Sequence, residues 1–145
     1  MMKILLPVDG SEQALAAVRH AIRLVEEGLQ ANFVLANVQG PANLYEMVSA
    51  PDVHVLEEVS ESAGTHLLAS AEALLRHAKL EFESEVGSGD PGHTLVDIAE
   101  RFGCDMIIMQ TSGAGDLRSA LLGSVSHSVV QGASIPVMLV KAVGD

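Results

Sequence analysis

Aromatic side chains are scarce in this chain of 145 residues: it has no tryptophan and one tyrosine, and aromatics make up only 3% of the sequence. The core must therefore be built from aliphatic side chains, which supply most of the 48% hydrophobic content. Strands buried on both faces of a helix-covered parallel sheet have this aliphatic character. The composition favours such a sheet, and the length suits one domain that spans residues 1–145.

Cysteine is nearly absent as well, since Cys104 is the only one in the sequence. A single cysteine excludes an internal disulfide framework, and a reducing cytoplasm is the expected location. No apolar run approaches the roughly 20 residues of a membrane-spanning helix. Met1 to Lys3 lead straight into an apolar segment without a signal-peptide layout. We therefore expect a cytoplasmic protein without a membrane partner, in which Cys104 is a small buried residue at a strand edge.

Basic residues are few: 8 lysines and arginines face 19 acidic residues, which gives a formal charge of −11. Such a surface repels phosphate backbones, so we expect no nucleic-acid partner. The six histidines show no short paired spacing with one another or with the cysteine, and we expect no metal site. The sequence also lacks a P-loop, a Gly-x-Gly-x-x-Gly turn after the first apolar run and a nucleophile elbow. The chain is not expected to be an enzyme.

Apolar periodicity predicts alternating strands and helices along the whole chain. Four helical patterns are predicted, which begin after Ser11, at about Asp52, after Asp90-Pro91 and after Gly123-Ser124. The second pattern runs to about residue 79, although Gly64 interrupts it. Strands alternating with helices indicate an α/β protein with a doubly wound parallel sheet. The third strand alternates polar and apolar residues, which is typical of an edge or near-edge strand. The strands are predicted at about 3–8, 32–38, 80–86, 106–109 and 135–140.

The segment from Asp105 to Val129 is the most informative stretch of the chain. A buried strand is followed by small residues from Thr111 to Gly115, and then by a helix that begins at Gly123-Ser124. We expect Val125, Val129 and Val130 on one side of this helix. A strand, a glycine-bearing loop and a helix N-terminus together can bind an anion, because unpaired N–H groups and the helix dipole point at it. The alternative is that these glycines only turn the chain.

Ligands of doubly wound sheets bind at the carboxyl ends of the strands. Pro7, Val8 and Asp9 end the first predicted strand, and Gln110 to Gly113 follow the fourth. Asp9 could hydrogen-bond a ribose or a base, or it could cap the following turn.

Five short segments, in fixed order, carry a resemblance to a known family. They are Ile-Leu-Leu-Pro-Val-Asp-Gly-Ser at 4–11, Gly-Asp-Pro at 89–91, Asp-Met-Ile-Ile-Met at 105–109, Leu-Leu-Gly-Ser-Val-Ser at 121–126 and Ile-Pro-Val-Met-Leu-Val-Lys at 135–141. Over essentially its full length the chain resembles the UspA-type universal stress proteins. The resemblance implies a single-domain, open five-stranded parallel sheet of order 3-2-1-4-5 with helices on both faces. This is a Rossmann-like, adenine nucleotide alpha-hydrolase-like fold, usually dimeric, and one branch of the family binds ATP.

In that branch the resemblance implies a motif of Gly, two residues, Gly, nine residues and then Gly-Ser or Gly-Thr. Gly113, Gly123 and Ser124 match its later elements, whereas Gln110 stands at the first glycine. We expect Gln110 to weaken nucleotide binding, because it adds a side chain where the backbone should approach the ligand. By the same resemblance the site residues are Pro7, Val8, Asp9, Val38, Met109, Gln110, Gly113, Gly123, Ser124 and Val125.

Two interpretations remain open at this stage. In the first, the protein is a stress-response module that binds ATP or another adenine nucleotide, with or without Mg²⁺. In the second, it is a stress-response dimer without a nucleotide that acts through protein contacts. In both we expect a homodimer through the apolar terminal strand, Ile135 to Val140, with Val137 and Leu139 in the interface.

Overall fold

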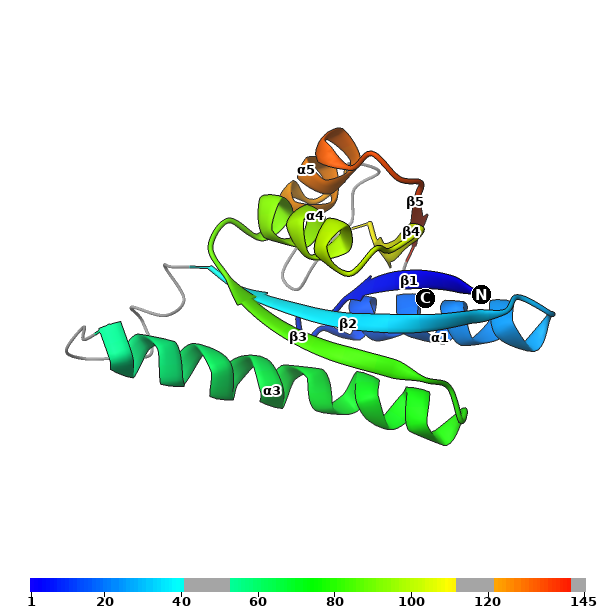
Figure 1. Cartoon of the computed structure of the whole chain (residues 1–145), viewed down its shortest axis with the longest axis horizontal. Coiled ribbons are helices and arrows are strands. Elements are labelled where there is room, and N and C mark those ends of the chain that lie inside the picture. The colour runs from blue at the N-terminus through cyan, green and yellow to red at the C-terminus, as the bar shows by residue number, and fades with distance from the viewer. Residues whose placement is uncertain (41–52, 112–121, 142–145) are drawn as a thin grey trace.

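The computed structural model describes residues 1–40, 53–111 and 122–141, with the backbone alone for 53–62 (Figure 1). Strands and helices alternate throughout this part of the chain, as predicted. The elements are β1 (Met2–Pro7), α1 (Glu12–Glu26), β2 (Ala31–Gln39), α3 (Val53–His77), β3 (Phe82–Ser88), α4 (Pro91–Arg101), β4 (Met106–Gln110), α5 (Ser124–Gly132) and β5 (Val137–Val140).

The strands form one five-stranded sheet of order β3-β2-β1-β4-β5, and all paired neighbours are parallel. The expected order and the edge position of β3 are thus confirmed. The β1–β2 ladder extends from Met2 to Pro7. By contrast, β1 pairs with β4 only at Ile4 and Leu5. The two central strands therefore separate towards their carboxyl ends, at the point where the chain order of the sheet reverses.

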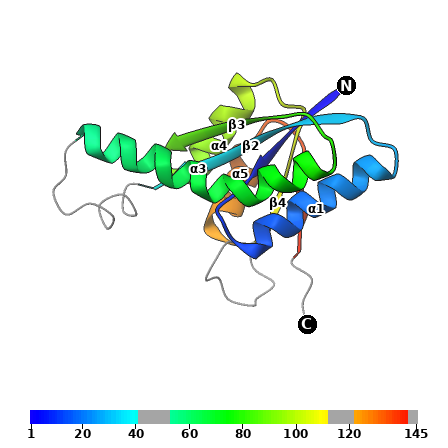
Figure 2. The ribbon, with the colours of Figure 1, turned by 90° about the horizontal axis from the view of Figure 1, so that it is seen from below.

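Helices cover both faces of the sheet. Figure 2 shows α1 and α3 in front of one face, while α4 and α5 lie on the other face in Figure 1. The apolar residues of each strand alternate between the two cores, as the pleat requires. Ile4 and Leu6 pack with α1 and α3, and Leu5 and Ile107 pack with α4 and α5.

Side chains at the expected positions begin two of the helices. Ser11 Oγ accepts a hydrogen bond from the Ala14 amide at 3.1 Å at the start of α1. Asp90 Oδ2 accepts one from the His93 amide at 3.1 Å at the start of α4. This bond to the backbone amide of His93, together with the His93 side chain, lowers the pKa of Asp90.

Gly64 does not interrupt α3, and packing gives the reason. A methyl group on Gly64 would collide with Val86, at 2.9 Å from its Cγ2, and would lie 3.0 Å from Asn37 Oδ1. The absence of a side chain lets α3 approach β2 and β3 closely. Glycine in a helix interior is roughly 1 kcal/mol less favourable than alanine, but a larger residue at this position would not fit against β2 and β3.

Three sequence-based expectations need correction. β5 begins at Val137 and not at Ile135, because strand pairing with β4 starts at Ile107–Val137. β3 covers Phe82–Ser88, two residues later than predicted. Its pairing with β2 sets these bounds, since Phe82 pairs with Phe33 and Ser88 pairs with Gln39. Val129 is fully buried, but Val130 is 42% exposed. The prediction that Val130 shares one side with Val125 is therefore wrong: at 3.6 residues per turn, five residues turn the helix roughly 140° past a full circle.

Candidate functional site

A cavity of about 360 Å³ lies at the carboxyl ends of β1, β2 and β4, against α4 and α5. The separation of β1 from β4 places it at the reversal of strand order, where open α/β sheets bind their ligands. Its lining comprises Pro7, Val8, Asp9, Ala36, Val38, Gly40, Pro91, Leu95, Met109, Gln110, Gly123, Ser124, Val125 and Ser126.

The structure brings together the predicted site residues that it describes. Nine of them line this cavity: Pro7, Val8, Asp9, Val38, Met109, Gln110, Gly123, Ser124 and Val125. The tenth, Gly113, lies outside the described residues.

Sequence reasoning missed several lining residues, namely Ala36, Gly40, Pro91, Leu95 and Ser126. Strand alternation could have indicated Ala36, since it shares a face with Val38. The hydroxyl of Ser126 had no comparable signal.

Buried amides fix the β1 side of the cavity. Asn37 Nδ2 donates to the Val8 carbonyl at 2.8 Å, and Gln39 Nε2 donates to Asn37 Oδ1 at 2.6 Å. The Val8 amide donates to the Ala36 carbonyl at 2.8 Å. Asn37 and Gln39 are 1% and 4% exposed, so water does not compete for these bonds. The backbone of Val8 is consequently held on both its donor and its acceptor side.

Asp9 is committed largely to its own turn. Its Oδ1 accepts hydrogen bonds from the Ser11 amide at 2.9 Å and from Ser11 Oγ at 2.5 Å. Of the two roles considered for Asp9, turn capping is thus present in the structure. Its Oδ2 stays available on the cavity side, where it receives one long hydrogen bond, 3.4 Å, from Gln110 Nε2.

The β4 side of the cavity is fixed to α5. Ser126 Oγ donates to the Gln110 carbonyl at 2.8 Å, and the Gly123 amide donates to the Thr111 carbonyl at 2.8 Å. Gly123 is the N-cap of α5 and offers no side-chain hydrogen bond. The first amides of α5 therefore have no side-chain cap where Ser124 and Val125 line the cavity, which is the arrangement that binds anions.

Gln110 is the least satisfied polar residue of the site. Its side chain is neither in solvent nor free, because the residue is only 6% exposed and its amide nitrogen reaches Asp9. Its Oε1 is buried and has no hydrogen-bond partner among the described residues. A buried unpaired acceptor is unusual in native proteins and destabilises the state that contains it.

A family model described as the universal stress protein family matches residues 1–141. The chain belongs to this family. Among its relatives, universal stress protein MJ0531 of Methanocaldococcus jannaschii is 29% identical over 96% of this chain and 81% of its own length. Universal stress protein YxiE of Bacillus subtilis is 28% identical over 96% of this chain and 98% of its own length.

Solved structures agree with the fold. The structure of protein MJ0577, also from Methanocaldococcus jannaschii, has a TM-score of 0.81 at 25% identity and covers 99% of this chain and 98% of that one. UspA from Lactobacillus plantarum has a TM-score of 0.75 at 24% identity, with 96% and 97% coverage. The five-stranded parallel sheet with helices on both faces is thus the Rossmann-like fold of universal stress proteins.

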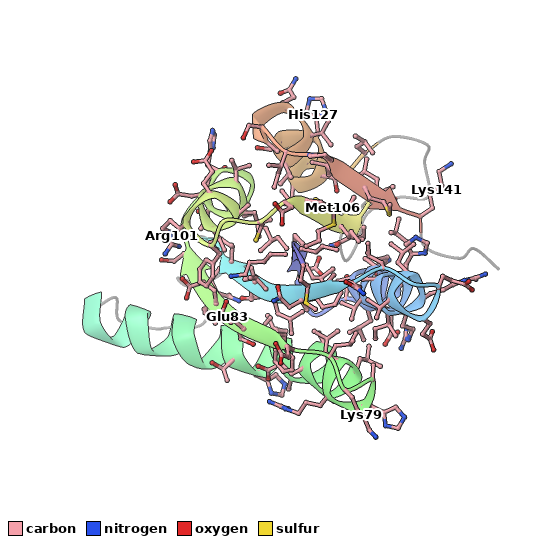
Figure 3. All side chains as sticks on the ribbon, turned by 45° about the vertical axis from the view of Figure 1, so that its right-hand side comes forward. Lys79, Glu83, Arg101, Met106, His127 and Lys141 are labelled. Carbon is pink, nitrogen blue, oxygen red and sulfur yellow. The ribbon has the colours of Figure 1, made fainter. Side chains whose placement is uncertain are left out.

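Side-chain charge contributes little to this universal stress protein's cavity. No lysine or arginine is among the lining residues that the structure describes, and Asp9 adds a negative charge. Lys79, Arg101 and Lys141 are exposed at the periphery in Figure 3. Within the described residues, attraction for an anion in the cavity therefore comes mainly from the backbone amides and dipole of α5.

The described residues offer neither a metal site nor a membrane span. They contain no group of three or more His, Cys, Asp and Glu side chains arranged to hold a metal ion. No helix among them has the length and apolar character needed to cross a membrane. Cys104 is 7% exposed beside the start of β4, and burial raises the pKa of its thiol.

Proposed function

We propose that this universal stress protein is a regulatory module that binds an adenine nucleotide in the cavity at the carboxyl ends of β1, β2 and β4. The observation that carries the proposal is the N-terminus of α5, which has no side-chain cap and borders the cavity at Ser124 and Val125. Two structural neighbours support the choice of nucleotide. An Arabidopsis thaliana family member was solved with AMP bound (TM-score 0.68), and another universal stress protein in complex with cAMP (TM-score 0.67).

The order of the strands supports a proposed position for each part of the ligand. Val38 on β2, Asp9 after β1 and Gln110 on β4 follow one another across two strand spacings, roughly 10 Å. Pro91 and Leu95 of α4 add apolar surface near β2. In the proposed complex the base lies against this apolar end, the ribose lies at the crevice between β1 and β4, and the phosphate lies at Ser124.

Binding is proposed to be weaker than in a chain with glycine at position 110. Gln110 bridges the crevice to Asp9, so a ligand must displace its side chain. The lining also lacks a cation among the described residues, which disfavours triphosphate more than monophosphate. Asp9 already accepts hydrogen bonds from Ser11 and Gln110, so we do not propose it as a Mg²⁺ ligand. Any Mg²⁺ in the complex would be bound by the phosphates of ATP.

The two edges of the sheet support a proposed homodimer through β5. The edge strand β3 carries the carboxylates Glu83 and Glu85 at alternate positions, and Glu81 directly precedes it, which discourages pairing with another chain. At the other edge Val137 to Val140 are apolar and only half-buried within one chain. A second copy that covers β5 would bury them and satisfy the free backbone edge. If no nucleotide binds, this surface is the basis of the alternative function, a dimer that acts through protein contacts.

Calorimetric titration with AMP and ATP tests the proposal, with Gly123→Val as the decisive variant. Gly123 has φ −66° and ψ 162°, which a valine can adopt, so the fold should be retained. A branched side chain there should prevent the phosphate from approaching the backbone and should reduce AMP affinity at least about tenfold, or ~1.4 kcal/mol.

Gln131→Val provides the matched control, since Gln131 is exposed near the far end of the same helix. It should bind AMP like the parent. If Gly123→Val also binds like the parent and its circular dichroism is unchanged, the phosphate does not lie at α5 and the proposal is wrong. Native mass spectrometry of the purified protein adds a direct search for bound nucleotide.

A further inference from the structure

Among the described residues, one side-chain hydrogen bond crosses the crevice between the carboxyl ends of β1 and β4. The strands pair only at Ile4–Met106 and Leu5–Ile107, and beyond these residues no ladder joins them. The hydrogen bond from Gln110 Nε2 to Asp9 Oδ2 spans the crevice farther out, between residues 101 positions apart in the chain. At 3.4 Å it lies beyond the usual range of N–H···O distances, so it is a weak bond.

Hydrogen bonds hold the backbone beneath this contact, so movement at this level requires the Gln110 side chain to leave Asp9. The Gln110 carbonyl accepts from Ser126 Oγ at 2.8 Å, and residue 110 pairs with Val140 of β5. Asp9 is held in turn by Ser11. Any opening of the crevice at this level therefore occurs by rotation of the Gln110 side chain.

While the hydrogen bond between Gln110 and Asp9 is formed, two oxygen atoms of these side chains can still accept further hydrogen bonds. Asp9 Oδ2 has one weak donor, and Gln110 Oε1 is buried without a partner among the described residues. A ligand that presents two adjacent hydroxyl groups supplies what is missing. One O–H can donate to Asp9 Oδ2 in place of the amide, and the other can donate to Oε1 after the amide has rotated.

We propose that Gln110 and Asp9 form a selectivity latch, which opens for ligands that carry a free vicinal diol, such as an unmodified ribose. The inference rests on the proposed nucleotide function, because it deepens the specificity of the same site. A ligand without the diol breaks the latch and leaves both acceptors unsatisfied. A nucleotide with both hydroxyls replaces the broken bond and satisfies the buried Oε1 as well.

The test combines two ligands with two proteins. The ligands are AMP and 2′,3′-dideoxy-AMP, and the proteins are the parent and Gln110→Met, which retains most of the side-chain volume but has no amide. The parent should bind AMP at least about tenfold more tightly than the dideoxy ligand. In Gln110→Met this ratio should fall by about fivefold or more, because the amide that couples to the hydroxyls is gone.

Two further variants control the comparison. Gln131→Met makes the same chemical change on an exposed part of α5 and should keep the parent's ratio. Gln110→Gly removes the latch altogether; it should bind both ligands more tightly than the parent and discriminate less between them. It also supplies the measurement if Gln110→Met does not fold.

The outcomes separate the latch from the function on which it rests. If the parent binds AMP and its ratio is unchanged in both Gln110 variants, the latch is refuted and the nucleotide site stands. If the parent and the variants show no AMP binding at millimolar concentration, the proposed function fails and the latch fails with it.

Discussion

Gly92 lies at a close contact between α4 and α5, the two helices that border the cavity. It lies in the first turn of α4 and is buried against Ser128 in the middle of α5. A methyl group at position 92 would collide with Ser128 Oγ and would lie 2.5 Å from Ser128 Cβ. Because Cβ is attached to the backbone, rotation of the serine side chain cannot relieve this collision. Gly92→Ala must therefore push the two helices apart.

The expected loss of stability follows from two opposing effects. Overpacking a tight contact destabilises by typically about 1–3 kcal/mol. Alanine is favoured over glycine within a helix by roughly 1 kcal/mol, and less in the first turn. We expect Gly92→Ala to lower the free energy of unfolding by about 1–2 kcal/mol. For a chain of this size that corresponds to a fall in Tm of roughly 2–8 °C.

Urea denaturation at one fixed protein concentration measures this change, together with Ser128→Gly and the double variant. Ser128→Gly removes the side chain that the methyl group meets, so the double variant should be at least about 1 kcal/mol more stable than the sum of the single effects predicts. Gly132→Ala serves as the control on the same helix pair, since its methyl group would meet Val96 Cγ2 at an ordinary 3.6 Å. If Gly92→Ala equals Gly132→Ala in stability, the helix contact has room that the structure does not indicate, and the reasoning is refuted.

Two other expectations concern the edge strand and the thiol. Light scattering at micromolar concentration should give twice the chain mass of 15.2 kDa, and the mass of one chain would contradict pairing through β5. Burial raises the pKa of the Cys104 thiol, so iodoacetamide at pH 8.5 should label the folded protein far more slowly than the urea-unfolded chain. Because the thiol ionises more easily in the unfolded chain, its ionisation favours unfolding. The contribution of Cys104 to the free energy of unfolding is complete below the ordinary cysteine pKa of about 8.5, and it is lost as the pH rises through the raised pKa of the folded protein. Equal labelling rates, or stability that does not fall in alkaline solution, would show that Cys104 is not shielded as described.

The alternation of strands and helices could be predicted because its signals are local. Ser11 and Asp90 each accept a hydrogen bond from an amide three residues on, so the sequence neighbourhood contains the whole interaction. The order of the strands is different in kind. No local pattern states that β1 lies between β2 and β4, and that order was available only through the resemblance to a family.

The contacts that shape the site join distant parts of the chain, and for this reason the sequence did not reveal them. Gln110 could be identified as a departure from a glycine motif, but not as a partner of Asp9. The chain pattern suggested that Gly64 weakens a helix, whereas the structure shows that it permits close packing against Asn37 and Val86. In both cases the residue type identified a position that is important for the site or the packing. The residue that it contacts could be identified only from the tertiary structure.

The two walls of the cavity are held by separate sets of hydrogen bonds, and this separation is why we propose that one weak contact between them controls binding. Asn37 and Gln39 fix the β1 wall through buried hydrogen bonds, and Ser126 fixes the β4 wall through the Gln110 carbonyl. Walls that are already ordered lose little conformational entropy when a ligand binds, so its affinity depends mainly on the contacts it makes and breaks. The contact that the proposed ligand would break in the crevice is the hydrogen bond between Gln110 and Asp9. Selectivity at this site is therefore expected to depend on what a ligand offers those two side chains, more than on any rearrangement of the fold.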